Sequence, residues 1–283
     1  MVQLKPVDGT DYYLWKYLPS IPAAAVFIVL FTGNTGALWW RTIKARSWFC
    51  IPFDIGGLFQ MIGYSTRVFA HYRTDLIAPY AVQSSFILLA PVFYAASIYM
   101  VLGRLIRSVH GERFSIIRPA RMTKLFVLAD ILSLNVQGNG AGLTVKDKTQ
   151  KIGKYIVIAG LFIQLIAFGW FVVAAFMFHV RMRRTVGKDP SSRPNVPWRQ
   201  GLMMIYICSA LIMVRSVFRV VEYMMGMDAY LLSHEWPTYV FDAAPMWTVQ
   251  MTFLLWFPDR LKPEQHGGSE DGHVLMGNGS PME

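Results

Sequence analysis

The sequence predicts an all-α polytopic membrane protein with seven transmembrane helices in one bundle, the N-terminus outside and the C-terminus in the cytoplasm. Of its 283 residues, 54% are hydrophobic and only 16% are charged, whereas soluble domains carry about 25% charged residues. Seven apolar stretches are long enough to cross a bilayer, which takes roughly 20 residues. The Lys and Arg residues gather in alternate connections between these stretches, which sets the orientation.

The apolar stretches divide the chain into three parts. We place them near residues 20–40, 49–70, 77–103, 122–143, 153–180, 200–225 and 237–258. An extracellular segment (1–19) precedes the seven-helix domain (20–260), and a disordered cytoplasmic tail (261–283) follows it. The tail is polar and glycine-rich, a composition that does not fold by itself. The first 20 residues lack the basic-then-apolar order of a cleaved signal peptide, so the first stretch is expected to stay as an anchor.

The basic residues are distributed unequally between the two sides of the bilayer. The first, third and fifth connections and the tail hold 17 Lys and Arg residues, whereas the opposite side holds 7. The positive-inside rule therefore places the richer side in the cytoplasm. A net charge of +10 would suggest nucleic acid in a soluble protein. Here the basic connections are expected to meet anionic lipid headgroups instead.

Four of the predicted helices carry polar side chains on one face, by the 100° step of an α-helix. These are Gln60, Tyr64 and Arg67; Asp130, Ser133 and Gln137; Arg215, Arg219 and Glu222; and Glu235 with Asp242. Three arginines balance three mid-span carboxylates, those of Asp130, Glu222 and Asp242. Six unpaired charges facing lipid would cost on the order of 15–20 kcal/mol. We therefore expect these faces to turn toward one another or toward a wet cavity.

Two interpretations of this polar core stay open, and they are compatible. One is a structural ion-pair network that locks the helices together. The other, which we favour, is a pocket that also meets a ligand or a proton, since intramembrane ionisable groups are functional by default. The predicted substrate-binding or polar-core residues are Gln60, Arg67, Asp130, Ser133, Gln137, Arg215, Arg219, Glu222, Glu235 and Asp242.

Asp130 is the mid-membrane carboxylate with no arginine within one turn of its own helix. It is a candidate for exchanging a proton against a cationic amphiphile, while Ser133 and Gln137 on the same face hydrogen-bond that ligand. The alternative is that Asp130 pairs with Arg215 or caps a neighbouring helix. The glycines that follow at positions 138, 140 and 142 are expected to let helix backbones approach closely or to unwind the outer end of this helix.

Signatures of enzymes are missing from the sequence. There is no G-x-x-x-x-G-K-[ST] phosphate loop, no H-E-x-x-H zinc motif and no G-x-S-x-G nucleophile elbow. The six histidines are scattered over connections, the tail and one helix end. We therefore expect no catalytic residue, no metal, no cofactor and no enzymatic activity. Cys50 and Cys208 both lie in apolar stretches, so a disulfide is not expected.

Seven motifs, in order along nearly the whole chain, resemble the fungal lipid-translocating exporter family, the RTA-like or aminocholesterol-resistance proteins. They are YLPS (17–20), GYSTR (63–67), LLAPVFYAASIYMVLGR (88–104), FVLADILSLNVQGNGAG (126–142), GLFIQ (160–164), LIMVRSVFRVVEY (211–223) and HEWPTYVFDAAPM (234–246). The resemblance implies a seven-helix protein tied to export of, or resistance to, sphingoid bases and sterol-like amines. Gln60 stands where the family commonly has Glu, and Asn139 interrupts the family's glycine run.

These observations favour a transporter or translocator of amphipathic lipids, sphingoid-base-like or sterol-like, that contributes to resistance against toxic lipids. Without a nucleotide site, transport would be downhill or ion-coupled. The alternative is a seven-helix lipid sensor or receptor, since the predicted topology also describes receptors. A membrane-embedded lipid enzyme ranks third. The expected partners are a lipid or amphipathic small molecule and the membrane, with no nucleic acid. The plasma membrane is the expected location, with vacuolar or other endomembranes as alternatives.

Overall fold

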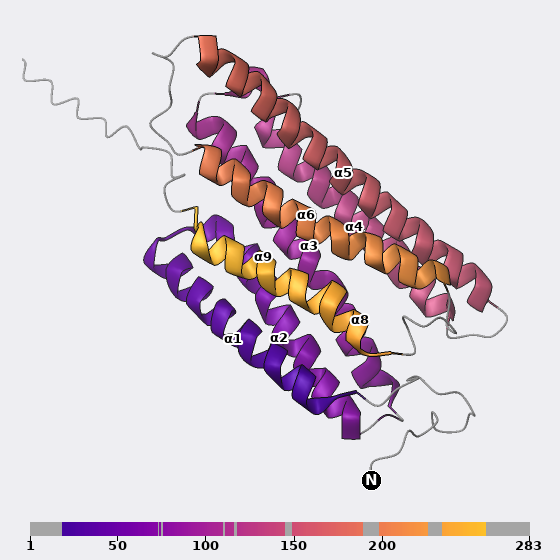
Figure 1. Ribbon diagram of the computed structural model, residues 1–283. Coiled ribbons are helices and arrows are strands. Elements are labelled where there is room, and N and C mark those ends of the chain that lie inside the picture. The colour runs from indigo at the N-terminus through magenta and orange to yellow at the C-terminus, as the bar shows by residue number, and fades with distance from the viewer. Residues whose placement is uncertain are drawn as a thin grey trace, which may run out of the picture.

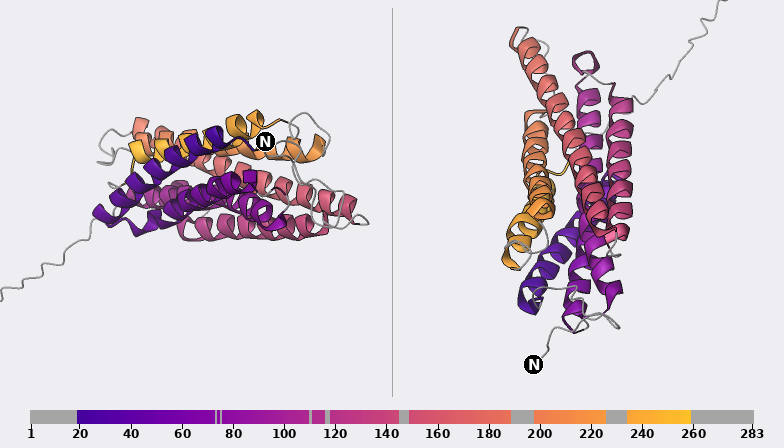
Figure 2. Two further views of the ribbon diagram at one scale, coloured as in Figure 1. Left: turned by 90° about the horizontal axis from the view of Figure 1, so that it is seen from below. Right: turned by 90° about the vertical axis from the view of Figure 1, so that its right-hand side faces the viewer.

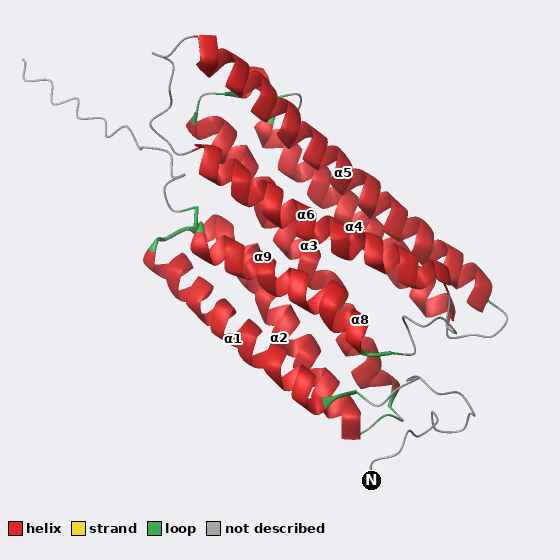
Figure 3. Ribbon diagram, viewed as in Figure 1, coloured by secondary structure: helices red, strands yellow, loops and turns green. Residues whose placement is uncertain are grey.

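The computed structural model describes residues 19–72, 74, 76–109, 111–115, 118–144, 149–188, 198–225 and 234–258, and every long element in them is a helix (Figure 3). The predicted extracellular segment, apart from its last residue, and the predicted tail lie outside these ranges. The elements are α1 (Ile21–Lys44), η1 (Trp48–Cys50), α2 (Ile51–Tyr72), α3 (Ile77–Ser108), η2 (Glu112–Phe114), α4 (Pro119–Thr144), α5 (Gln150–Lys188), α6 (Trp198–Met225), α8 (Trp236–Thr238), η4 (Tyr239–Ala243) and α9 (Ala244–Leu255).

Each of the seven predicted spans contains a helix. The seventh contains three consecutive elements, α8, η4 and α9, which follow one another without a break as a single rod. Four helices in the described residues are long and apolar enough by themselves to cross a membrane: α1, α3, α5 and α6. α2 and α4 carry the polar residues noted above, and α9 has only 12 residues when counted without α8 and η4. The chain is thus an all-α polytopic membrane protein. The crossing of all seven rods and the orientation stay predictions.

The helices run side by side along one long axis (Figures 1 and 2). Neighbouring rods are in contact in the order α1, α2, α3, α4, α5, α6 and α9, and α3 also packs across the bundle against α6. α9 contacts α1 and thereby closes the ring. Because α3 is shared by both halves of the bundle, its side chains reach polar groups on either side.

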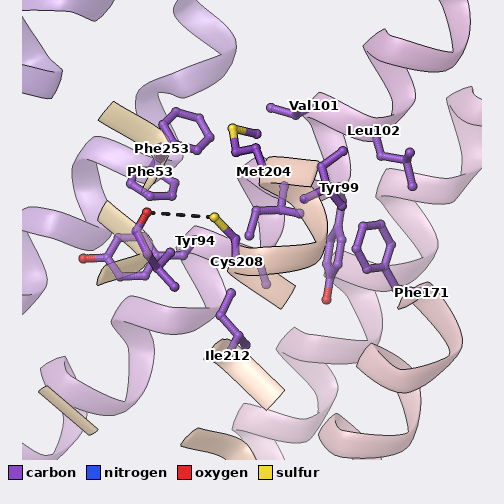
Figure 4. Close-up of a cluster of buried hydrophobic side chains, with 14 of the residues drawn as sticks. Phe53, Tyr94, Tyr99, Val101, Leu102, Phe171, Met204, Cys208, Ile212 and Phe253 are labelled. Carbon is purple, nitrogen blue, oxygen red and sulfur yellow. Dashed lines mark hydrogen bonds between the residues drawn. The ribbon is translucent and has the colours of Figure 1, made fainter. Parts of the chain in front are cut away.

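Aromatic and aliphatic side chains fill the centre of the bundle (Figure 4). Phe53 stacks on Phe253 with ring centroids 4.0 Å apart, and Phe171 meets Tyr99 at 4.5 Å. The outer surface is apolar as well. On α5, for example, Ile166 is 67% exposed and Trp170 is 62% exposed. Large apolar side chains on both the inside and the outside of helices are typical of a lipid-facing bundle rather than a soluble one.

Gly140 brings α4 and α5 into contact. A Cβ atom there would lie 2.8 Å from the backbone nitrogen of Val157 and 3.0 Å from the carbonyl oxygen of Gly153, so only glycine fits. α4 remains helical through Thr144. Of the two expectations for these glycines, close approach is therefore confirmed at Gly140, and unwinding of the helix end is wrong. Gly138 and Gly142 have open space around them.

Candidate functional site: a buried ion network and a separate carboxylate

Asp242 is the centre of an ion network between α6 and η4. Asp242 is fully buried. One oxygen of its carboxylate accepts a hydrogen bond from Arg215, and the other accepts one from Arg219. Arg219 also donates to Glu222 at 2.9 Å, three residues along α6. Of the polar faces expected to turn toward one another, those of α6 and of the last rod therefore meet in the structure. The spacing i, i+4, i+7 gives the reason, since it puts all three α6 side chains on one face.

Arg215 extends the network to α3. Its second guanidinium nitrogen donates to the carbonyl oxygen of Ile87 at 2.8 Å, although a helix carbonyl normally accepts only from its own helix. A buried charge is tolerated only when it is paired and hydrogen-bonded. Arg215 satisfies both conditions, so this arginine joins three helices: α3, α6 and the rod that contains η4.

A wide helical turn positions Asp242. The five residues Tyr239–Ala243 form a π-helix, and Pro245 follows at the start of α9. Proline has no N–H, so Pro245 cannot donate to the carbonyl of Phe241 as an α-helix would require. Without this hydrogen bond, the helical turn before Pro245 can widen from an α-helix to a π-helix. π turns of this kind inside helices are frequent at functional sites.

A second ion pair closes the end of the bundle where α2 finishes and α8 begins. Arg67 donates to Glu235 at 2.9 Å. Glu235 also accepts from the backbone N–H of Ser20, which precedes α1, and from the hydroxyl of Tyr239. The Arg67 guanidinium lies 5.3 Å from the centre of the Tyr239 ring. One carboxylate thus ties together α1, α2 and the last rod.

Asp130 lies in a different part of the bundle, and the structure corrects the expectation that all four polar faces meet. The hydroxyl of Tyr99 on α3 donates to the Asp130 carboxylate at 2.9 Å. No arginine, lysine or histidine among the described residues forms an ion pair with Asp130. The alternative in which it pairs with Arg215 is therefore wrong. Ser133 donates to the backbone carbonyl of Asp130 at 2.8 Å, and Gln137 donates to Gln164 on α5 at 3.0 Å.

α3 separates these two polar regions. Tyr94 and Tyr99 project from opposite sides of this helix, Tyr94 toward Phe53 and Tyr99 toward Phe171 (Figure 4). The hydroxyl of Tyr94 accepts a hydrogen bond from Gln250 of α9 at 2.8 Å. Polar partners of the α4 face therefore come from α3 and α5, not from the helices that hold the arginines.

Several polar residues in the interior of the bundle, buried or half-buried, were missed in the sequence. Asp54 lies inside the second predicted span, is 1% exposed, and forms no ion pair with a described residue. Gln164 and Gln250 are amides within apolar stretches. Their positions inside apolar spans could have identified all three, because a polar group inside a membrane span needs a partner within the protein. Tyr99 carried no such signal, since tyrosine is common in membrane helices.

Gln60 is fully buried, and neither atom of its amide has a hydrogen-bond partner in the part of the chain that the structure describes. Gln60 therefore places an uncharged amide in the interior of the bundle, without joining either ion pair described above. The described residues contain no group of three His, Cys, Asp or Glu side chains that could hold a metal ion.

Comparison with known proteins identifies the family. A sequence model of the family described as "RTA1 like protein" matches residues 53–265, which include every candidate residue named above. The chain belongs to the RTA1-like family. It is 32% identical to Protein RTA1 of Saccharomyces cerevisiae over 89% of this chain and 86% of that protein.

Two further relatives of this RTA1-like chain from the same yeast carry names that state an activity. Protoporphyrin uptake protein 1 is 31% identical over 86% of this chain and 91% of its own length. The sphingoid long-chain base transporter RSB1 is 28% identical over 89% of this chain and 79% of its own length. No solved structure matches the chain. Membership of the family and these relatives support membrane transport related to lipids at the level of the family.

Proposed function

We propose that this protein moves a cationic, single-chain or sterol-like amphiphile across its membrane and that Asp130 receives the cationic headgroup. The observation that carries the proposal is the Tyr99–Asp130 contact: a carboxylate that is 1% exposed and is held by a neutral hydroxyl rather than by a cation. The carboxylates of Glu222, Glu235 and Asp242 already have arginine partners. Asp130 is therefore the carboxylate of the predicted site whose charge is available to a ligand.

The surroundings of Asp130 suit such a ligand. A buried carboxylate without a cation is costly, and an ammonium group that binds beside it offsets that cost. Arrival of the headgroup would therefore be coupled to release of a proton. Gln137 has an amide oxygen with no hydrogen-bond partner among the described residues and could accept from a hydroxyl of the ligand.

Reconstitution tests this proposal. Purified protein in liposomes is supplied with a fluorescent sphingoid base, and transbilayer movement is followed by quenching from one side. Wild-type protein should accelerate the movement, and Asp130→Asn should reduce the rate about tenfold or more, since a charge-assisted contact contributes about 1.5–3 kcal/mol. A fluorescent ceramide, which lacks the amine, should not distinguish the two proteins.

Asn135→Ala is the control on the same helix. Asn135 is exposed on α4 and its side-chain amide donates to the helix's own backbone, so its loss should leave transport unchanged. Folded Asp130→Asn protein that transports the base at the wild-type rate would refute the role of Asp130. Ligand-dependent binding to a cytoplasmic partner without any transbilayer movement would refute transport itself and favour a sensor.

A further inference from the structure

A hollow of about 480 Å³ lies at the C-terminal end of α5. Its described lining combines an apolar part with a cationic part, and consists of Phe176, His179, Val180, Arg183 and Arg184. These positions follow the i, i+3, i+4, i+7, i+8 pattern and so lie on one face of the helix. Phe176 is 58% exposed, so the apolar part of the lining is accessible and is not filled by a described neighbour.

The hollow lies where α5 leaves the hydrocarbon. Residues 155–180 contain no Lys, Arg, Asp or Glu, and they extend about 39 Å at 1.5 Å per residue, which is more than the roughly 30 Å of a bilayer core. Arg183 and Arg184 follow within four residues of the end of this stretch. They are therefore at the depth of lipid headgroups, while Phe176 and Val180 are at the depth of the acyl chains.

The charge of the hollow is not compensated within the described residues. Neither Arg183 nor Arg184 forms an ion pair with an acidic side chain there. Arg199, at the start of α6, and Arg183 both lie close to His179. The His179 ring stacks on Tyr206 at 5.7 Å, and its Nδ1 lies 3.1 Å from the Tyr206 hydroxyl. Two arginines of α5 thus line a recess that has an apolar extension.

We infer that this hollow binds an anionic phospholipid from the surrounding leaflet, with Arg183 and Arg184 holding the headgroup and Phe176 and Val180 contacting an acyl chain. Guanidinium groups bind phosphate through two parallel hydrogen bonds. Basic pockets of this kind between membrane helices bind lipid headgroups. The bound lipid would be a partner and not the transported cargo, because its charge is opposite to that expected at Asp130.

Binding is measured on the full-length protein by native mass spectrometry in detergent, with dioleoylphosphatidylserine as the probe and dioleoylphosphatidylcholine as the zwitterionic comparison. Wild-type protein should retain phosphatidylserine in preference to phosphatidylcholine. The double variant Arg183→Gln/Arg184→Gln should weaken phosphatidylserine binding about 30-fold, at about 1 kcal/mol for each basic residue. Glycerophosphoserine, which has the headgroup without acyl chains, should not displace the lipid.

The matched control is Arg121→Gln/Lys124→Gln. It removes the same charge from the start of α4, which packs antiparallel to α5 and meets it at the same end of the bundle, but outside the hollow. This control should bind phosphatidylserine as the wild type does. Equal losses in both double variants would show general electrostatic attraction and overturn a defined site. Displacement by glycerophosphoserine would show a site for free anions. Unchanged binding by folded Arg183→Gln/Arg184→Gln would also refute the inference, whatever the transport assay shows.

Discussion

Arg67 and Glu235 form an ion pair at 2.9 Å although 168 positions separate them in the chain. Glu235 simultaneously holds the backbone of Ser20 and the hydroxyl of Tyr239. One side chain therefore fixes the N-terminal end of α1, the end of α2 and the start of the last rod. This arrangement predicts how substitutions at that end of the bundle behave.

Glu235→Ala should lower the free energy of unfolding by about 2 kcal/mol. This figure lies below the 3–5 kcal/mol typical of a broken buried pair, because Glu235 is 16% exposed and water screens part of the loss. Glu235→Gln, which keeps hydrogen bonding but not charge, should lose less. Thermal unfolding in detergent measures both. Equal stability of Glu235→Ala and wild type would contradict the structural role.

Asp242→Asn should be among the most destabilising single substitutions in the network, by about 3–5 kcal/mol, because it removes the anion that two arginines share. Glu222→Gln serves as the comparison. It should cost clearly less, since Arg219 keeps its bond to Asp242. Unfolding curves of the two variants in one detergent give the order directly. The reverse order would mean that Asp242 is not the centre of the network.

Tyr99→Phe should lower stability by about 1 kcal/mol, the usual net contribution of one hydrogen bond. If Asp130 receives the headgroup, the same variant should keep transport of the sphingoid base above that of Asp130→Asn, because the carboxylate is still present. Measuring unfolding and transport on the same preparations separates these effects. Transport as low as in Asp130→Asn would show that the Tyr99 hydroxyl, and not only the carboxylate, is required.

Gly140→Ala should destabilise the α4–α5 contact, because the new methyl group would meet the backbone of α5 at 2.8–3.0 Å. Gly138→Ala is the paired control, with no atom within 4 Å. There alanine should be neutral or stabilise by up to about 1 kcal/mol through its higher helix propensity. Opposite signs in the two unfolding temperatures are expected. A loss of stability at Gly138 as large as at Gly140 would refute close approach as the reason.

A tag at the N-terminus should be accessible from outside intact cells, whereas a tag after Lys262 should not be. The reason is the excess of basic residues, 17 against 7, on the side assigned to the cytoplasm. Antibody labelling before and after permeabilisation measures accessibility. Labelling of both tags in intact cells would contradict an odd number of crossings.

The sequence was sufficient for the helical class and for the polar faces that carry Asp242, Glu222 and the arginines, because apolar length and helical period depend only on local order. It did not reveal which polar faces meet. Asp130 and Arg215 both lie on inward faces, yet α3 stands between their clusters, and that separation depends on how the helices pack. Tyr99 shows the same limit, since only the tertiary contact distinguishes it from other aromatic residues. The wide turn at Tyr239–Ala243 likewise changes the register of one helix without altering its hydrophobic pattern.

The ion network around Asp242 and the separate Arg67–Glu235 pair, taken together as the paired charges, have a consequence for the effect of membrane voltage. Arg67, Arg215 and Arg219 bring three positive charges, and Glu222, Glu235 and Asp242 bring three negative ones. Moving one elementary charge through 100 mV is worth about 2.3 kcal/mol, but a group of zero net charge that moves as a unit gains nothing from the field. The membrane potential therefore does no net work on these paired charges when each group shifts as a body. Voltage acts on the protein through groups outside them, such as Asp130 and the cationic cargo proposed to bind there.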